Sequence, residues 1–383
     1  MRIVLSGIGT NNKGAELMLY AILQEIENRY PKATVFVPLD SVSQGRSYIC
    51  SSLDIREKPI TAIRKWGSVL HINGVLKRIG CPKIVYEDIY AVPRTDLFLD
   101  ASGLYYSDVW NLSDSFVGRR NTLLYKHHKQ GTRIVFLPQS FGPLTQRSIQ
   151  SGICGLNEYV DLVCARDKVS LSFLHESGLL NMDKVRLYPD FTASVKGIVP
   201  SGFDHLHNGI CIIPNCRLFD KRGLHIKNYI ALVDLICKSS FMSGKVPYFL
   251  NHEGPDDRRV IDAVNEAIDR KLEVVDNLNA LEAKGLISTA FLTVSSRYHG
   301  VASSLSSTVP CLSVGWSHKY EELCRDYGQF DTLLPIDEME KCETILRRSL
   351  DNKHNASVRL MLKDRVRANL ESIRQMWNEV WEI

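Results

Sequence analysis

Two residues in the stretch from Ala290 to Gly315 have side chains that can hold an anion and move a proton. Arg297 carries a permanent positive charge, and His299, two positions later, carries an imidazole that titrates near neutral pH. The surrounding pattern predicts a short strand, a tight turn and a helix from about Arg297 to Ser307. Both residues are therefore expected at a strand end and a helix N-terminus, where α/β sheets bind ligands and anions are favoured. The alternative is an ordinary first helical turn with a surface arginine and a packed histidine.

Polar side chains also follow several other stretches whose hydrophobic pattern predicts strands. They belong to Asn12, Glu16, Gln139, Ser140, Arg166, His252 and Lys319, while Ser295 and Ser296 directly precede Arg297. Because the carboxyl ends of parallel strands meet at one edge of a sheet, these residues are candidates for lining a cleft. Simpler roles stay open: Glu16 can stabilise the first turn of a helix, and Arg166 can form a surface ion pair. Lys319 can equally be an ordinary surface residue.

The loop from Gly7 to Gly14 separates the first predicted strand, residues 2–6, from a helix predicted from about Ala15 to Asn28. Its Gly-x-Gly lacks the third glycine of a dinucleotide-binding fingerprint, and Gly14 is not followed by the Lys-Ser/Thr pair of a Walker loop. Two interpretations remain. The glycines serve only to reverse the chain, or the loop from Asn11 to Glu16 lines a cleft.

Strands alternate with helices along the chain, which predicts the α/β class with parallel, doubly wound sheets. Because 383 residues exceed one ordinary core, we expect two domains, residues 1–195 and 209–383, joined by a linker at 196–208. Residues 41–94 predict one or two helices. The last segment, Glu338–Ile383, is expected to be helical and to cross back to the N-terminal domain, with a membrane-facing amphipathic helix as the alternative.

Composition argues against several functional classes. Lys and Arg total 47 against 43 for Asp and Glu, and no dense basic block with interleaved aromatic residues indicates nucleic-acid binding. Ten cysteines without a Cys-x-x-Cys pair favour free thiols in a reducing cytosol over disulfides or zinc. The tandem His127-His128 points in two directions on a helix, so no metal site is predicted. We find neither a signal peptide nor an apolar run long enough to span a membrane.

Five short pieces occur in order along the chain. They are Asn12–Glu16; Leu137–Pro143; Ala165–Ser170 with Ser177-Gly178 and Pro189-Asp190; Ser295–Gly300 with Val309-Pro310; and Gly315–Lys319 with Glu321–Gly328. Their order and spacing cover most of the chain and resemble the polysaccharide pyruvyl transferase family. Two departures stand out: Ala101-Ser102-Gly103 replaces a turn that often has three glycines, and Tyr298 replaces a leucine found in many members. The first departure changes how closely an acceptor can approach the backbone.

The resemblance implies a fold like that of the GT-B glycosyltransferases, with two Rossmann-like domains facing a cleft. It also implies an enzyme that moves pyruvate from phosphoenolpyruvate onto a sugar of a surface polysaccharide or exopolysaccharide as a cyclic ketal. The scheme requires no metal and no cofactor, because phosphoenolpyruvate is the donor substrate. The implied partner is a glycan acceptor, free or lipid-linked, in the cytoplasm or at the inner face of the membrane, where the protein makes peripheral contact.

The resemblance also assigns roles to the residues that match it. His299 and Arg297 are the expected catalytic residues: Arg297 clamps a donor anion, and His299 protonates the enol carbon, takes a sugar proton, or does both in turn. The expected donor-binding residues are Arg166, Arg297, Ser295, Ser296, Lys319 and His252, and the expected acceptor-binding residues are Asn12, Glu16, Gln139 and Ser140. Two other functions stay open: a nucleotide-sugar-dependent glycosyltransferase of the same fold, and a glycan-binding protein without catalysis.

Overall fold

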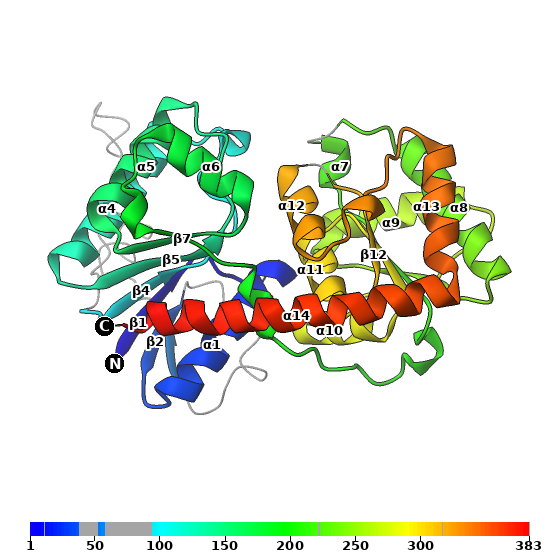
Figure 1. The fold of residues 1–383 in the computed structure, drawn as a ribbon, viewed down its shortest axis with the longest axis horizontal. Coiled ribbons are helices and arrows are strands. Elements are labelled where there is room, and N and C mark those ends of the chain that lie inside the picture. The colour runs from blue at the N-terminus through cyan, green and yellow to red at the C-terminus, as the bar shows by residue number, and fades with distance from the viewer. Residues whose placement is uncertain (11, 38–52, 58–93, 221–222, 316, 383) are drawn as a thin grey trace, which may run out of the picture. The chain divides into compact units, whose positions relative to one another are not determined.

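The computed structural model describes residues 1–10, 12–37, 53–57, 94–220, 223–315 and 317–382 (Figure 1). These residues form two compact units. The first unit comprises Met1–Ile8, Leu23–Leu187 and Val380–Ile383, and the second comprises Gly9–Ile22 and Tyr188–Glu379. The one or two helices expected within residues 41–94 lie outside the described residues, which in that interval include the short strand β3 (Asp54–Glu57).

The units differ from the contiguous domains predicted from the sequence, because residues 9–22 and 188–208 belong to the second unit. Close packing within that unit explains the difference. A Cβ on Gly14 would overlap the imidazole of His299, and a Cβ on Gly197 would overlap the backbone at Gly285. Local periodicity in a sequence does not reveal which core a loop packs against.

The first unit is built on a seven-stranded parallel sheet in the order β3-β2-β1-β4-β5-β6-β7. The other strands are β1 (Arg2–Ser6), β2 (Thr34–Val37), β4 (Leu97–Asp100), β5 (Arg133–Gln139), β6 (Leu162–Ala165) and β7 (Val185–Leu187). Every residue of β4 and β6 is buried, as expected for parallel strands covered on both faces. Sequence order reverses between the neighbours β1 and β4, so their carboxyl ends form the switch point of this sheet.

Within the described residues, four helices accompany the first sheet in sequence. They are α1 (Lys13–Arg29), α4 (Asp114–Lys129), α5 (Arg147–Tyr159) and α6 (Lys168–Ser177), with 3₁₀ turns at Asp108–Trp110 and Met182–Lys184. Helices α4 and α5 pack against each other at glycines: a Cβ on Gly155 would meet the side chain of Asn121, and one on Gly152 would lie 3.1 Å from Val117. Glycine and serine lower the helix propensity of α5, so the sequence does not predict it. The helix is supported by this packing and by Ile149, Ile153 and Leu156, which are buried in the core of the first unit.

The second unit contains a five-stranded parallel sheet in the order β10-β9-β8-β11-β12. Its strands are β8 (Ile210–Ile213), β9 (Pro247–Leu250), β10 (Val274–Val275), β11 (Leu292–Ser295) and β12 (Cys311–Ser313). Its helices are α7 (Arg217–Asp220), α8 (Ile226–Met242), α9 (Gly254–Ala267), α10 (Ala280–Thr289), α11 (Tyr298–Ser306), α12 (His318–Asp326), α13 (Met339–Leu350) and α14 (Asn352–Val380), with 3₁₀ turns at Phe191–Ser194, Asp204–Leu206 and Phe330–Thr332. The switch point lies between β8 and β11. The two parallel sheets confirm the predicted α/β class.

The C-terminal helix α14, red in Figure 1, contributes residues to both units. In the second unit Trp377 packs edge-on against Phe191, with ring centroids 5.9 Å apart. In the first unit Trp381, the residue that follows α14, packs on Tyr30, with centroids 5.2 Å apart. Both tryptophans are buried. The apolar side chains that could have faced a membrane in an amphipathic helix therefore pack against other side chains of the protein. Among the described helices, none is both long enough and apolar enough to cross a membrane.

A buried ion pair organises the loop that follows β4. Arg120 of α4 contacts the Asp100 carboxylate, whose side chain is fully buried, and also donates to the hydroxyl of Ser102 at 3.2 Å. Burial alone would raise the pKa of Asp100, but Arg120 and hydrogen bonds from Ser102 and Gln139 outweigh it and hold the pKa below 3.8. The turn is tight on its other side too, since a Cβ on Gly7 would overlap Ser102.

We predict that Arg120→Met lowers the free energy of unfolding by about 3–5 kcal/mol, because it leaves the Asp100 carboxylate buried without its charged partner. Chemical denaturation measures the change. The matched control is Lys129→Met at the exposed end of the same helix, which should change stability by less than about 0.5 kcal/mol. Equal stability of the two variants would show that the pair does not support the fold.

Candidate functional site

Arg297 and His299 lie where the sequence predicts them. Strand β11 ends at Ser295, Arg297 is the N-cap residue of α11, and His299 is in its first turn. Side-chain hydrogen bonds shape the turn. Among them, the Ser295 hydroxyl accepts from the Arg297 backbone N–H at 3.1 Å, and the Ser296 hydroxyl donates to the carbonyl of Ile213 in β8 at 3.2 Å. The residues therefore stand at the switch point of the second sheet, and the hydroxyls of Ser295 and Ser296 hold the turn in shape.

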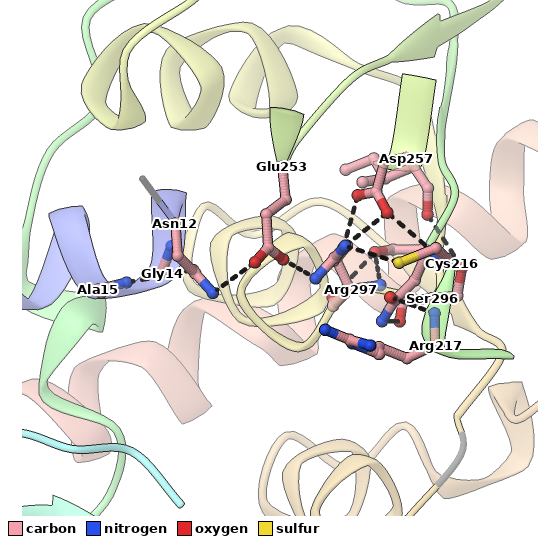
Figure 2. A network of polar contacts seen from close by, with 12 residues as sticks. Asn12, Gly14, Ala15, Cys216, Arg217, Glu253, Asp257, Ser296 and Arg297 are labelled. Carbon is pink, nitrogen blue, oxygen red and sulfur yellow. Dashed lines mark hydrogen bonds and ion pairs between the residues drawn. The ribbon is translucent and has the colours of Figure 1, made fainter. Parts of the chain in front are cut away.

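The Arg297 guanidinium contacts two carboxylates (Figure 2). Its Nε and Nη2 donate to the two oxygens of Asp257 in the first turn of α9, at 2.7 and 2.5 Å. Its Nη1 pairs with Glu253, the residue that precedes α9. Asp257 is itself held by the backbone N–H of Cys216 at 3.0 Å. The bidentate geometry expected for a donor anion is thus made here with Asp257.

Burial disfavours the charged forms of both Arg297 and Asp257. Loss of solvation raises the pKa of Asp257 above 3.8 and lowers the pKa of Arg297 to about 10, which leaves the guanidinium charged near neutral pH. Each charge therefore depends on the other for its stability in this part of the fold. Removing either one would leave an uncompensated buried charge.

Asn12 connects the start of α1 to the same network. Its side-chain Oδ1 accepts from the backbone N–H of Gly14 at 2.8 Å, so the residue caps the helix. Its Nδ2 donates to Glu253 at 3.0 Å, as Figure 2 shows. The Glu253 carboxylate therefore bridges Asn12 and Arg297. Glu16, one turn into α1, is buried and pairs with Lys13 at 3.3 Å.

His299 packs between an acidic side chain and a glycine of α1. Its Nε2 lies 3.7 Å from the Asp190 carboxylate, which also accepts from the backbone N–H and the hydroxyl of Thr192. This distance exceeds a hydrogen bond, so Asp190 acts on the ring through its charge. On the Nδ1 side, the imidazole lies directly against Gly14, where no side chain fits.

His252, which follows β9, is buried close to these residues. Burial holds the pKa of His252 well below 6.5, and the positive charges of Arg297, His299 and Lys13 act in the same direction. His252 is therefore neutral near pH 7. It can form hydrogen bonds with a bound donor substrate, as the sequence predicts, but it does not add a charge to the site.

Lys319 lies beside the aromatic residue that separates Arg297 from His299. Its ammonium is 5.5 Å from the ring centroid of Tyr298, whose edge packs against the His299 imidazole at 5.1 Å between centroids. The cation is thus drawn toward the first turn of α11, in the same region as the other predicted donor-binding groups of the second unit.

The remaining predicted residues form a separate cluster in the first unit. Arg166, after β6, is buried and donates to the hydroxyl of Ser140 at 2.9 Å. Ser140 in turn donates to Asp167 at 2.8 Å, and the Gln139 amide donates to Asp100 at 3.3 Å. Asn12 and Glu16, which were expected with Gln139 and Ser140, belong to the second unit.

Sequence reasoning missed three acidic residues that shape the site: Asp190, Glu253 and Asp257. Asp190 belongs to the Pro189-Asp190 motif and Glu253 directly follows His252, but the sequence predicts a role for neither. Asp257 lies in the run Gly254–Arg259, which looks like an ordinary charged helix start. The available signal was an arginine at a strand end, because a buried guanidinium requires a carboxylate partner. In the part of the chain that the structure describes, no cluster of three or more histidine, cysteine, aspartate or glutamate side chains is placed to hold a metal ion.

The chain matches the model of one protein family. That family is described as polysaccharide pyruvyl transferase, and the match runs from residue 12 to residue 318. It therefore includes the Asn12–Glu16 turn, Arg166, Arg297 and His299, and it ends at the start of α12. A search by sequence among curated proteins finds no match.

Solved structures of similar fold span nearly the whole chain at low sequence identity. A trehalose-6-phosphate synthase, OtsA, is 9% identical over 100% of this chain and 99% of its own, with a TM-score of 0.61. A UDP-GlcNAc 2-epimerase from Methanocaldococcus jannaschii is 12% identical over 92% and 94%, with a TM-score of 0.57. Anabaena Alr3699/HepE, solved with UDP and glucose, is 11% identical over 97% and 99%, with a TM-score of 0.51. These likenesses confirm the predicted GT-B-like fold.

We predict that Gly14→Ala destabilises the protein by about 1–3 kcal/mol, because the added methyl group overlaps the His299 imidazole. The cost should largely disappear in the background His299→Ala, where the ring is absent. Thermal and chemical unfolding of the four proteins in this cycle measure the coupling. Gly9→Ala is the matched control in the same loop, since a Cβ there meets nothing within 4 Å. Equal costs in both backgrounds would contradict the close packing.

We predict that His252 makes the protein less stable in acid. Below pH 6.5 the unfolded chain protonates this imidazole while the folded state resists, so the unfolded state binds more protons and stability rises with pH. Relative to His252→Asn, the wild-type free energy of unfolding should fall by up to about 1.4 kcal/mol for each pH unit below 6.5. The comparison uses denaturant titrations between pH 7 and roughly pH 5, with the exposed His128→Asn as control. Parallel profiles for wild type and His252→Asn would contradict this.

Proposed function

Because the chain belongs to the polysaccharide pyruvyl transferase family, we propose that it transfers the pyruvyl group of phosphoenolpyruvate to a sugar of a surface polysaccharide or exopolysaccharide and closes it as a ketal. The observation that carries the proposal is the placement of Arg297 and His299 on the first turn of α11, at the switch point of the second sheet. An anion-binding group and a proton carrier side by side are what this donor requires.

The chemistry needs one proton delivered to carbon and one anion released. The donor's C3 takes a proton and becomes the methyl group, while C2 forms bonds to two sugar hydroxyl oxygens and loses its bond to the phosphate oxygen. Of the two hydroxyl protons, one balances the new methyl hydrogen and the other leaves with phosphate. A single titratable side chain can serve both transfers in turn.

His299 is the residue we assign to this proton transfer. The Asp190 carboxylate lies 3.7 Å from Nε2, where its negative charge can stabilise the imidazolium that forms when the ring takes a proton. A bound donor adds negative charge and shifts the balance toward the protonated form. The protonation state of His299 therefore depends on whether the donor is bound, which suits a group that must both give and take a proton.

Arg297 and Lys319 supply positive charge for the donor, and the neutral His252 supplies hydrogen bonds. Arg166, Gln139 and Ser140 belong to the first unit, and we propose Arg166 for donor binding and the Gln139-Ser140 turn for the acceptor. We assign Asn12 and Glu16, at the start of α1, to the acceptor as well; Asn12, which contacts Glu253, also borders the donor-binding groups of the second unit. We propose that the reaction takes place in the cytoplasm, with a free or lipid-linked acceptor at the inner face of the membrane.

The test is incubation with phosphoenolpyruvate and a panel of glycosides, with phosphate release and product mass as readouts. A product heavier by pyruvate less one water supports the proposal. We predict that His299→Asn lowers turnover by about 10²–10⁴ while phosphoenolpyruvate still raises the melting temperature. The exposed His175→Asn is the control and should keep full activity. Near-normal turnover of His299→Asn would remove His299 from the proton transfer, and stabilisation by nucleotide sugars alone would favour a glycosyltransferase.

A further inference from the structure

The two carboxylates on Arg297 differ in character. The side chain of Asp257 is fully buried, contacts both Nε and Nη2, and accepts a backbone N–H from Cys216. The side chain of Glu253 is 27% exposed, precedes α9 and contacts Nη1. Both carboxyl groups therefore share one guanidinium, and Glu253 is the one of the two that is in contact with water.

Glu253 is held at both of its oxygens. One oxygen pairs with Arg297 Nη1, and the other accepts from Asn12 Nδ2 at 3.0 Å (Figure 2). Two donors placed on the two oxygens of one carboxylate form a carboxylate-binding geometry, and here the protein fills it with its own side chain. We propose that Glu253 is a displaceable internal anion: it occupies the place on Arg297 and Asn12 that an anionic group of the ligand takes, and it leaves when that ligand binds.

The physical balance makes the exchange feasible. A partly exposed carboxylate recovers much of its hydration when it turns into water, whereas the buried Asp257 cannot. The adjacent Gly254 has a φ of +62°, a backbone conformation that glycine adopts without strain. Asp257 stays in place throughout, so Arg297 keeps its orientation while Nη1 changes partner.

The internal anion also sets a threshold for ligands. A small monoanion that displaces the Glu253 carboxylate forms contacts no stronger than the contacts that are lost, so its net binding free energy is small. A ligand that carries both a phosphate and a carboxylate offers further charge to the same region and can displace Glu253. The identity of that ligand rests on the proposed function, whereas the displacement can be measured with inorganic phosphate alone.

The experiment compares anion binding by wild type and Glu253→Gln, with inorganic phosphate and phosphoenolpyruvate titrated by calorimetry at fixed ionic strength. Glutamine keeps the shape and an oxygen for Asn12 but loses the charge. We expect Glu253→Gln to bind both anions about tenfold or more tightly, the scale of one charge-assisted hydrogen bond that no longer has to be broken. The matched control is Asp256→Asn, which removes the same charge from an exposed position of α9 that pairs with Arg259; its affinity should stay within about twofold.

Unchanged or weaker anion binding by Glu253→Gln would overturn the inference. So would lost turnover with unchanged affinity, since Glu253 would then act in the chemistry. If Glu253→Gln fails to fold, Glu253→Asp provides the test: the shorter side chain keeps the charge but reaches Arg297 less well, so tighter anion binding is again expected. Failure of the proposed function is distinct, because wild type would then release no phosphate from phosphoenolpyruvate while Glu253→Gln still binds inorganic phosphate more tightly.

Discussion

The buried ion pair between Arg297 and Asp257 is the interaction on which the second unit's site depends. An arginine at a strand end is turned toward α9 because a buried guanidinium needs a carboxylate, and Asp257 is fixed by its place in the first helical turn and by the Cys216 backbone. Neither charge is stable there alone, since burial shifts the pKa of each toward neutrality. The pair therefore connects the turn after β11 to α9 and to the turn after β8.

The same device occurs in the first unit, at the corresponding place. There the sequence order of strands reverses between β1 and β4, and Asp100 at the end of β4 pairs with Arg120 of α4. In the second unit the reversal lies between β8 and β11, and Arg297 follows β11. Strand ends at a switch point diverge and leave room for a ligand, so their loops need a firm anchor. A buried arginine–aspartate pair supplies that anchor in both units.

The site in the second unit draws on segments far apart in the sequence. The turn that begins α1 contributes Asn12 and Gly14, the segment after β7 contributes Asp190, and the turn after β9 contributes His252 and Glu253. Gly14 gives the imidazole of His299 its space, and Glu253 links Asn12 to Arg297. A change in any of these segments therefore alters the contacts of Arg297 or His299 at the first turn of α11.

The sequence by itself determined the α/β class, most strands, and the position of Arg297 and His299 at a strand end, because these follow from local periodicity and from turn residues. It also carried the family resemblance through motifs that remain recognisable in order. The tertiary structure alone decided that residues 9–22 pack with the second unit, that α5 forms against α4 at Gly152 and Gly155, and that Asp257 and Glu253 share Arg297. These features depend on contacts between residues tens to hundreds of positions apart. The partner of a buried charge is chosen by the fold, and no local pattern contains it.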